Sequence, residues 1–284
     1  MESNKASTTA WAVAMARAAH ARYHSPPIFD DSLVLSLIDP QFQSMLEFFA
    51  PPEQPDATYN NRAYIAFRQR YQEQCLAQSY AAGLRQYVIL GAGLDSYAFR
   101  QSQQMPALKI YEVDFPATQQ QKAERIAELG WQHPGNLLFA PCDFNVDSLQ
   151  DCLVNAGFDP ALPAYFAWMG VTVYLPQHTV AETLATLLAV APAGGRVALE
   201  YAPPTETLVG DDRLCREASL AQPTRADEPF LSFYTLADMQ ALLNGLGYRD
   251  IEPLDHDAAA AEVLAGRDDG LGIHYGFRLL SAYW

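Results

Sequence analysis

The chain has 284 residues, of which 50% are hydrophobic and 18% charged, so it can bury a sizeable core and should form one large domain with an appended helical segment. Its formal net charge of -15 would repel nucleic-acid phosphates and anionic membranes, which excludes tRNA, DNA and membrane surfaces as expected partners. The four cysteines are scattered and the six histidines do not cluster, so neither a disulfide set nor a metal site is predicted.

Residues 1–82 have a helical pattern that prolines interrupt. The breaks fall at Pro26, at Pro40 and in a proline-rich link, Pro51–Pro55. We expect these residues to form a helical cap that is part of the same domain as residues 83–284.

The alanine-rich stretch Ala10–Ala21 begins the cap. Arg17 and His20 interrupt its apolar residues, and it is too short to span a membrane, so it is predicted as an amphipathic helix rather than an export signal. We expect it to cover the ligand site. Without an export or membrane segment, the predicted location is cytoplasmic.

A glycine-rich turn follows in YVILGAGLDSYAFR, Tyr87–Arg100. The apolar run before it suits a strand buried on both faces, and Gly91 and Gly93 let the backbone turn tightly and approach a ligand. In a dinucleotide fingerprint, Ser96 would be a third glycine. The turn therefore indicates a Rossmann-like nucleotide site with weak support for a pyrophosphate; alone, it could also be an ordinary turn.

The next predicted strand, in KIYEVDFP (Lys109–Pro116), ends in Asp114. An acid about 20 residues after the glycine turn is typical of a site that holds ribose hydroxyls. Two alternatives stay open: Asp114 could cap the next helix, or Glu112, one pleat deeper on the same face, could take its role.

A third run, NLLFAPCDF at residues 136–144, ends in Asp143 and Phe144. An acid beside an aromatic ring at this point could hydrogen-bond the exocyclic amine of adenine while the ring packs on its face. Three consecutive strand ends thus offer a turn, a ribose contact and a base contact.

Beyond this point strands continue to alternate with helical patterns, which predicts a parallel sheet covered by helices on both faces. The predicted helices are 117–129, 149–156, 177–190 and 236–246, and the remaining predicted strands are 164–171, 196–201, 249–254 and 274–283. The last two strands are expected to form a terminal hairpin.

The long polar stretch at residues 203–232 is predicted as a loop that acts as a substrate lid, since it follows a strand at the edge where ligands bind. Aromatic residues near it, Tyr174, Tyr201 and Tyr234, are candidates for lining the substrate pocket. Core packing is the alternative for each of them.

Taken together, these segments resemble the leucine carboxyl methyltransferase superfamily of S-adenosylmethionine enzymes, and especially its bacterial O-methyltransferase branch. The resemblance covers most of the chain. It is carried by FDDSLV, FRQRYQEQCL, AGLRQYVILGAGLDSYAFR, YEVDFP, the CDF step, AGFDPALP, VYLP and EPFLSFYTLADMQALLNGLGY.

The resemblance implies a class I methyltransferase fold: a seven-stranded, mostly parallel sheet with a terminal antiparallel hairpin and the helical cap. It also implies S-adenosyl-L-methionine as cofactor. The implied contacts are Arg68 with the methionine carboxylate, Gly91 and Gly93 with the amino acid part, Asp114 with the ribose, and Asp143 and Phe144 with the adenine. The forked guanidinium of Arg68 suits a carboxylate, although a solvated helix face is its alternative.

One position departs from the family pattern. Where the family has a glutamate before a glycine, the segment AWMGVTVYLP has Met169. This removes a carboxylate that could pair with the cofactor's ammonium group. Backbone carbonyls and water could replace it, or the pocket could be adapted to an apolar substrate, or methyl transfer could be impaired.

The function that this pattern predicts is O-methylation of a small-molecule carboxylate or phenol by in-line methyl transfer. A carboxylate acceptor is already ionised and needs no base, and the sequence identifies no catalytic base. A cofactor-binding protein with altered chemistry is the alternative, followed by an NAD-dependent dehydrogenase, which Ser96 disfavours. The sequence does not predict the oligomeric state.

Overall fold

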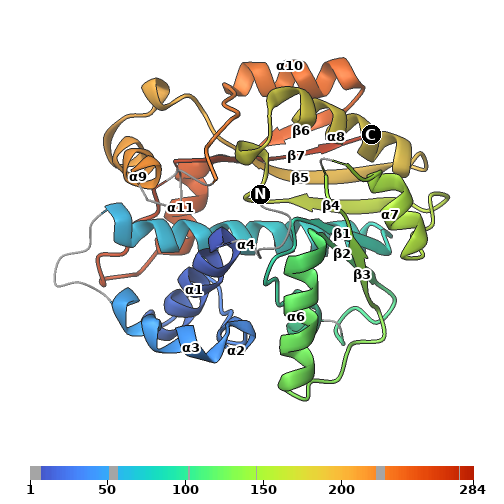
Figure 1. The fold of residues 1–284 in the computed structure, drawn as a ribbon. Coiled ribbons are helices and arrows are strands. Elements are labelled where there is room, and N and C mark those ends of the chain that lie inside the picture. Colours follow the sequence, from blue (N-terminus) through green and yellow to red (C-terminus); the bar gives the residue numbers. More distant parts are fainter. Residues whose placement is uncertain (1–7, 51–56, 102, 145, 222–227, 275) are drawn as a thin grey trace.

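A seven-stranded β-sheet forms the centre of the molecule. The computed structural model describes residues 8–50, 57–101, 103–144, 146–221, 228–274 and 276–284, so the predicted proline-rich link lies outside the described residues. The strands are β1 (Gln86–Leu90), β2 (Lys109–Asp114), β3 (Leu137–Pro141), β4 (Ala164–Trp168), β5 (Gly195–Tyr201), β6 (Arg249–Pro253) and β7 (Arg278–Tyr283). Their order across the sheet is β3-β2-β1-β4-β5-β7-β6 (Figure 1).

The sheet is parallel apart from its last strand. β7 is antiparallel to both of its neighbours, β5 and β6, whereas the other paired strands are parallel. The predicted mostly parallel sheet with a terminal antiparallel pair is therefore confirmed. The strand order reverses between β1 and β4, and in such sheets ligands bind at the carboxyl ends of the strands beside this reversal.

Helices cover both faces of the sheet, and the strand residues alternate between the two cores. Val88 and Leu90 of β1 face a core that also contains residues of α7, α8 and α10, whereas Tyr87 and Ile89 face a core with α4 and α5. The helices after β1 are α5 (Tyr97–Gln101), α6 (Pro116–Glu128), α7 (Leu149–Asn155), α8 (Gln177–Val190), α9 (Gly210–Leu220), α10 (Leu236–Leu246) and α11 (His256–Leu264).

Helices precede the first strand, in agreement with the predicted helical pattern of residues 1–82. They are α1 (Thr8–Tyr23), α2 (Val34–Leu37), α3 (Pro40–Gln43), the 3₁₀ helix η1 (Ser44–Phe49) and α4 (Ala57–Ala81). Met15 and the alanines beside it on α1 are buried against Val34, Ile38 and Leu46, which gives these helices a small core of their own. No helix in the described ranges is long and apolar enough to cross a membrane.

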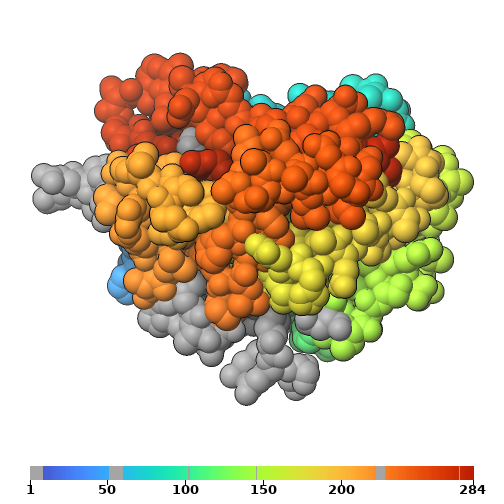
Figure 2. All heavy atoms as spheres, turned by 90° about the horizontal axis from the view of Figure 1, so that it is seen from above, coloured from blue at the N-terminus to red at the C-terminus, as the bar shows by residue number. Residues whose placement is uncertain are grey.

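Three predicted segments differ from the structure. The predicted loop at 203–232 contains the 3₁₀ turn η3 (Thr205–Thr207) and α9, because two acidic residues favour the first turn of α9 and Cys215 and Arg216 bury one side of it. The predicted final strand begins at Arg278 rather than at residue 274. Helix α11, which was not predicted, lies between β6 and β7. Seen from above, α9 and the segment that leads to α10 lie on the same face (Figure 2).

Candidate functional site

A cavity of about 510 Å³ lies at the carboxyl ends of β1 to β4. The turns after these four strands form its floor, and α1 and α4 contribute further walls. Glu228, Pro229 and Leu231, from the segment before α10, also line it. The residues expected to cover the ligand site, in α1 and near the end of the 203–232 stretch, thus lie at this cavity.

Seven residues predicted to bind the cofactor lie along the walls of this cavity. They are Arg68, Gly91, Gly93, Asp114, Asp143, Phe144 and Met169. Of the three predicted substrate tyrosines, Tyr174 also lines the cavity. Tyr201 and Tyr234 instead belong to the hydrophobic core, where they are 3% and 7% exposed. Both residues are close in sequence to segments that line the cavity, but their rings pack into the hydrophobic core.

The glycine turn after β1 needs its glycines. Gly91 and Gly93 have φ angles of +70° and +52°, which side chains rarely adopt. A Cβ at Gly91 would collide with the Val171 side chain, and one at Gly93 would lie 3.1 Å from the Cβ of Ala10 in α1. The turn is therefore packed closely between the β4 exit and the first helix, with its backbone open to the cavity.

Asp114, at the end of β2, is fixed to this turn. One carboxylate oxygen accepts a hydrogen bond from the backbone N–H of Gly93, and the other accepts one from Phe115 at 2.7 Å. Burial raises the pKa of Asp114, and the two backbone hydrogen bonds oppose that shift. Glu112 lies deeper and is bonded to Lys122, away from the cavity. Of the two acids, Asp114 is the one that reaches the ligand space.

Asp143 and Phe144 follow β3. The backbone N–H of Asp143 donates to the carboxylate of Asp147 at 2.8 Å, and Asp147 in turn donates its N–H to the Asp143 carbonyl at 2.8 Å. These bonds fix the backbone of the turn after β3, an edge strand of the sheet, and both Asp143 and Phe144 line the cavity. Cys142, just before them, is buried with Cys152 and Asp147 close by; all three could offer metal ligands within 4.8 Å of one another. However, burial raises the pKa of the Cys142 thiol, which disfavours the thiolate that a metal would need.

Arg68, on α4, is held from behind by a carboxylate that sequence reasoning missed. Its Nη1 donates to Glu200 at 2.7 Å, and the hydroxyl of Tyr64 donates to the other oxygen of Glu200 at 2.5 Å. Burial lowers the pKa of Arg68, but the Glu200 carboxylate, together with Tyr64 and Tyr174, raises it overall. The signal in the sequence was an acid inside the apolar strand RVALEY, a place where an unpaired carboxylate would be costly.

Met169 and Gly170 form the wall beside Arg68. Gly170 has a φ of +71°, and a Cβ on it would lie 3.0 Å from Nη1 of Arg68, so the guanidinium rests against this glycine. Met169 lines the cavity with an apolar side chain. The carboxylates that do line the cavity in the described part of the chain are those of Asp95, Asp114, Asp143 and Glu228.

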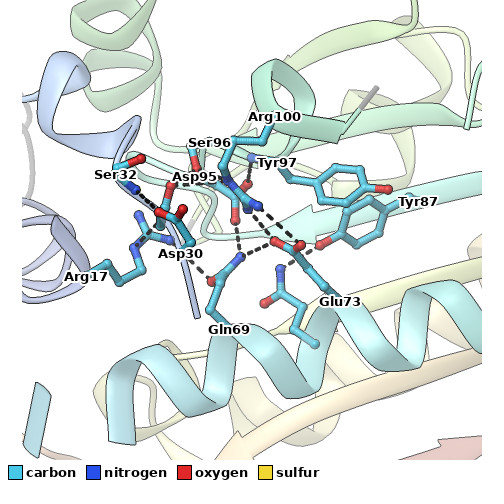
Figure 3. A network of polar contacts seen from close by, with 12 residues as sticks. Arg17, Asp30, Ser32, Gln69, Glu73, Tyr87, Asp95, Ser96, Tyr97 and Arg100 are labelled. Atoms are coloured by element: carbon cyan, nitrogen blue, oxygen red, sulfur yellow. Dashed lines mark hydrogen bonds and ion pairs between the residues drawn. The ribbon is translucent and has the colours of Figure 1, made fainter. Parts of the chain in front are cut away.

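A buried polar network ties the helical cap to the glycine turn (Figure 3). Arg17 of α1 donates to the carbonyl of Leu94 at 2.7 Å and to Gln69 of α4 at 3.2 Å. Gln69 donates to Asp95 at 2.9 Å, and Arg17 also lies 3.3 Å from the carboxylate of Asp31. The loop after β1 is therefore braced by side chains from α1 and α4, which precede it by 77 and 26 positions in the chain.

Ser96 takes part in the same network. Its hydroxyl donates to Asp31 and accepts from Nε of Arg100 at 2.8 Å, while Arg100 also pairs with Glu73. The residue that replaces the third glycine of a dinucleotide fingerprint is thus a buried anchor for the cap. A glycine there would leave Asp31 without this hydrogen bond.

Two segments meet over the cavity. The hydroxyl of Thr9, in the first turn of α1, donates to the carboxylate of Glu228. Leu231 is fixed by its backbone N–H, which donates to the carbonyl of Val173 at 2.7 Å. Residues 222–227 of the predicted lid lie outside the described residues. The described end of the segment and α1 both line the cavity.

Comparison with known proteins gives consistent matches. The family model for leucine carboxyl methyltransferase matches residues 10–188. A Bacillus subtilis protein provisionally named an S-adenosyl-L-methionine-dependent methyltransferase, YktD, is 30% identical over 97% of this chain and 98% of its own length. A Mycobacterium tuberculosis protein with the same provisional description is 34% identical over 68% of this chain and 65% of its own length.

Solved structures share the fold. A crystal structure of a provisionally assigned methyltransferase from Thermobifida fusca superposes with a TM-score of 0.57 at 15% identity, covering 88% of this chain and 92% of that one. A protein of the DUF574 family from Streptomyces avermitilis gives a TM-score of 0.55 at 14% identity, covering 94% of this chain and 98% of that one. At such identities the likeness shows the architecture alone.

Proposed function

This chain belongs to the leucine carboxyl methyltransferase family, and we propose that it transfers the methyl group of S-adenosyl-L-methionine to an oxygen atom of a small-molecule carboxylate or phenol. Methyl transfer that depends on S-adenosylmethionine follows from the family match and the curated relatives. The oxygen acceptor is our proposal. The observation that supports a cofactor site is the convergence of Arg68, Asp114 and Asp143 on one cavity beside the glycine turn.

The side chains of the cavity fit this cofactor. Arg68 offers a guanidinium to the methionine carboxylate, and it is already oriented by Gly170 and Glu200. Each carboxylate oxygen of Asp114 accepts one backbone N–H, which leaves lone pairs for the two ribose hydroxyls. Asp143 and Phe144 would hold the adenine. Gly91 and Gly93 have no side chain, so their backbone could approach the amino acid part closely.

The chemistry that the bound cofactor supplies is an electrophilic methyl group on a sulfonium. The protein has to hold the acceptor oxygen in line with it and keep water away. Orientation of this kind can lower a barrier by about 7–11 kcal/mol. The contact between Thr9 and Glu228, and the bond that fixes Leu231, keep α1 and the segment before α10 over the cavity. We therefore assign these two segments the role of excluding solvent.

The acceptor would enter beside Tyr174, Leu231 and Met169, which give this part of the wall an aromatic and apolar character. A carboxylate acceptor needs no proton transfer, because it is ionised at neutral pH. A phenol would need a base, and Glu228 is the carboxylate that the covering segment brings to the cavity. We propose Glu228 as that base for phenolic acceptors.

The first test measures cofactor binding by isothermal titration calorimetry. Replacing Asp114 with alanine removes the proposed ribose contact, and we expect at least a tenfold loss of affinity, corresponding to about 1.4 kcal/mol or more. Asp151→Ala removes an exposed acid on α7 and serves as the control, with affinity unchanged. Equal affinity of Asp114→Ala and the intact protein would contradict the assignment, and an intact protein that binds no S-adenosylmethionine would refute the proposed function.

Turnover is tested separately. Formation of S-adenosylhomocysteine would be followed with a panel of carboxylic acids and phenols, with amines and thiols of matched size included. We expect turnover with oxygen acceptors, and a phenol reaction that Glu228→Gln slows more than a carboxylate reaction. Transfer to nitrogen or sulfur acceptors alone would overturn the oxygen assignment, whereas binding without turnover on any acceptor would favour a cofactor-binding protein.

A further inference from the structure

Glu200 lies at the end of β5, directly behind the wall of the cavity. It is 2% exposed and does not line the cavity itself, whereas its partner Arg68 does. One of its oxygens accepts from Arg68 at 2.7 Å, and the other accepts from the hydroxyl of Tyr64 at 2.5 Å. The arginine that faces the ligand is thus already paired with a carboxylate of the protein.

A second buried arginine lies near the same carboxylate. Arg216 of α9 is 0% exposed and is surrounded by the rings of Phe230, Phe233 and Phe277, with its guanidinium carbon 4.5 Å from the centre of the Phe277 ring. Burial lowers its pKa to about 10, and the Glu200 carboxylate partly counteracts this. Its nitrogens donate to two backbone carbonyls, those of Pro203 and Gly276.

The charges of this cluster are unequal. Arg68 and Arg216 contribute two positive charges, and Glu200 contributes one negative charge. The nearby Arg278 has its own partner, Asp212, at 3.2 Å. A carboxylate that enters the cavity at Arg68 would make the cluster neutral, but it would also approach Glu200 through a medium of low dielectric constant.

We propose that Glu200 sets how tightly Arg68 binds the carboxylate of a ligand, by holding the guanidinium in place and competing for its charge. This inference rests on the proposed function, because it assigns the carboxylate to the methionine part of the cofactor. The ligand's carboxylate is attracted by Arg68 and repelled by Glu200. Tyr64, which donates to Glu200, reduces that repulsion.

A competing carboxylate has a consequence for turnover. The product, S-adenosylhomocysteine, keeps the same carboxylate and must leave before the next cycle. Without Glu200, Arg68 would bind the carboxylates of both the substrate and the product more tightly. Glu200 therefore limits the residence time of the product, a step that often limits turnover.

The test compares two ligands that differ in one group: S-adenosylmethionine and its decarboxylated form, which lacks only the carboxylate. Glu200→Gln keeps the size of the side chain and an oxygen that can accept from Arg68, but it removes the charge. We expect this variant to bind S-adenosylmethionine on the order of tenfold more tightly, given the Coulomb energy of charges at this range. The decarboxylated form should not bind more tightly.

Glu73→Gln is the matched control. Glu73 lies on the same helix as Arg68, is largely but not fully buried (14% exposed), and pairs with a different arginine, Arg100. This variant should change the affinities for the two ligands by the same factor, because its carboxylate does not face Arg68. A merely structural effect of losing a buried ion pair would appear equally in both variants.

Tyr64→Phe should change the affinity for S-adenosylmethionine in the opposite direction, so it tests the proposal if Glu200→Gln does not fold. Without the hydroxyl, the charge of Glu200 is left to Arg68, so S-adenosylmethionine should bind several-fold more weakly while the decarboxylated form is unaffected. The proposal is overturned if neither variant changes the ratio of the two affinities. If the intact protein binds neither ligand, the proposed function itself fails.

Discussion

Because Gly93 has no Cβ, the glycine turn after β1 can lie close to α1. A Cβ at Gly93 would lie 3.1 Å from the Cβ of Ala10, and the residue would be held at a φ of +52°. We expect Gly93→Ala to lower the free energy of unfolding by about 1–2 kcal/mol from backbone strain alone, with a further cost from the contact. Binding of S-adenosylmethionine should weaken as well, because the turn and α1 must shift. Thermal unfolding and calorimetry measure the two effects.

Gly130 provides the control for that substitution. Its φ is +63°, close to that of Gly93, but a Cβ there would have no heavy atom within 4 Å. Gly130→Ala should therefore show the strain cost with cofactor affinity unchanged. If both variants bound the cofactor like the intact protein, the close approach of α1 to the turn would have no role in binding.

Single residues at the ends of strands could be placed from the sequence, and their partners across the chain could not. Asp114 and Asp143 follow apolar runs, and parallel strands end at one edge of a sheet, so both side chains were expected near the glycine turn. Glu200 and Arg68 are 132 positions apart, and only the fold brings them together. Tyr201 neighbours Glu200 in sequence, but alternation along β5 turns its ring to the other face, into the core.

Among the elements, α1 is fastened to the glycine turn by Arg17. This side chain is 5% exposed and contacts the Leu94 carbonyl, Gln69 and Asp31. We expect Arg17→Met to destabilise the protein by about 3–5 kcal/mol, because it leaves a buried carboxylate with one cation fewer. Denaturant unfolding would measure the loss, and hydrogen exchange would show whether α1 becomes less protected.

Arg22→Met tests whether that loss is specific to Arg17. Arg22 is an exposed arginine on the same helix, so its replacement should change the free energy of unfolding by less than about 0.5 kcal/mol. In the Arg17 variant, Asp31 would still have Arg100, which lies 3.2 Å from its carboxylate. A small loss of unfolding free energy on Arg17→Met would mean that Arg100 alone compensates the charge of Asp31.

The sequence did not lead us to predict two helices, α11 and α9. The side chain of Asp255 caps α11 by accepting from the N–H of Ala258 at 3.0 Å, and alanines follow it. These are ordinary signals for a helix, but the expectation of a hairpin concealed them. In α9 the prolines and acids around residues 203–212 suggested a loop, while the buried side of the helix depends on Arg216, a charged residue that periodicity analysis counts as polar.

At the scale of the whole molecule, the cavity is assembled from segments distant in sequence. The turns after β1, β2, β3 and β4 give its floor, and this part followed from the alternation of strands and helices. The cover consists of α1 and the residues around Glu228, more than 200 positions apart, and they meet through the bond between Thr9 and Glu228. Polar residues with no periodic pattern carry such contacts, so the sequence indicated a cover without showing how its two parts touch.

The stability of the whole fold should depend on pH through His20, which is buried, and His256, which is partly buried. Nε2 of His20 accepts from the N–H of Ile28 at 2.9 Å, and Nε2 of His256 accepts from Leu279 at 3.2 Å, so both nitrogens must be unprotonated. Burial lowers the pKa of His20 to about 3 and that of His256 to about 4. Because the unfolded chain binds these protons near pH 6.5, stability is full above that pH and falls as the pH drops toward the folded values.

We therefore expect each histidine to cost about 2 kcal/mol of unfolding free energy between pH 6.5 and 5. Burial raises the pKa of Glu112 to about 7, which acts in the opposite direction over the same range, so the comparison must be made between variants. His20→Gln keeps an acceptor for Ile28 but cannot be protonated, and its unfolding free energy, measured in urea at a series of pH values, should fall less steeply. If the variant and the intact protein gave parallel pH profiles, the pKa of His20 would be the same in the folded and unfolded states, and other groups would cause the loss of stability in acid.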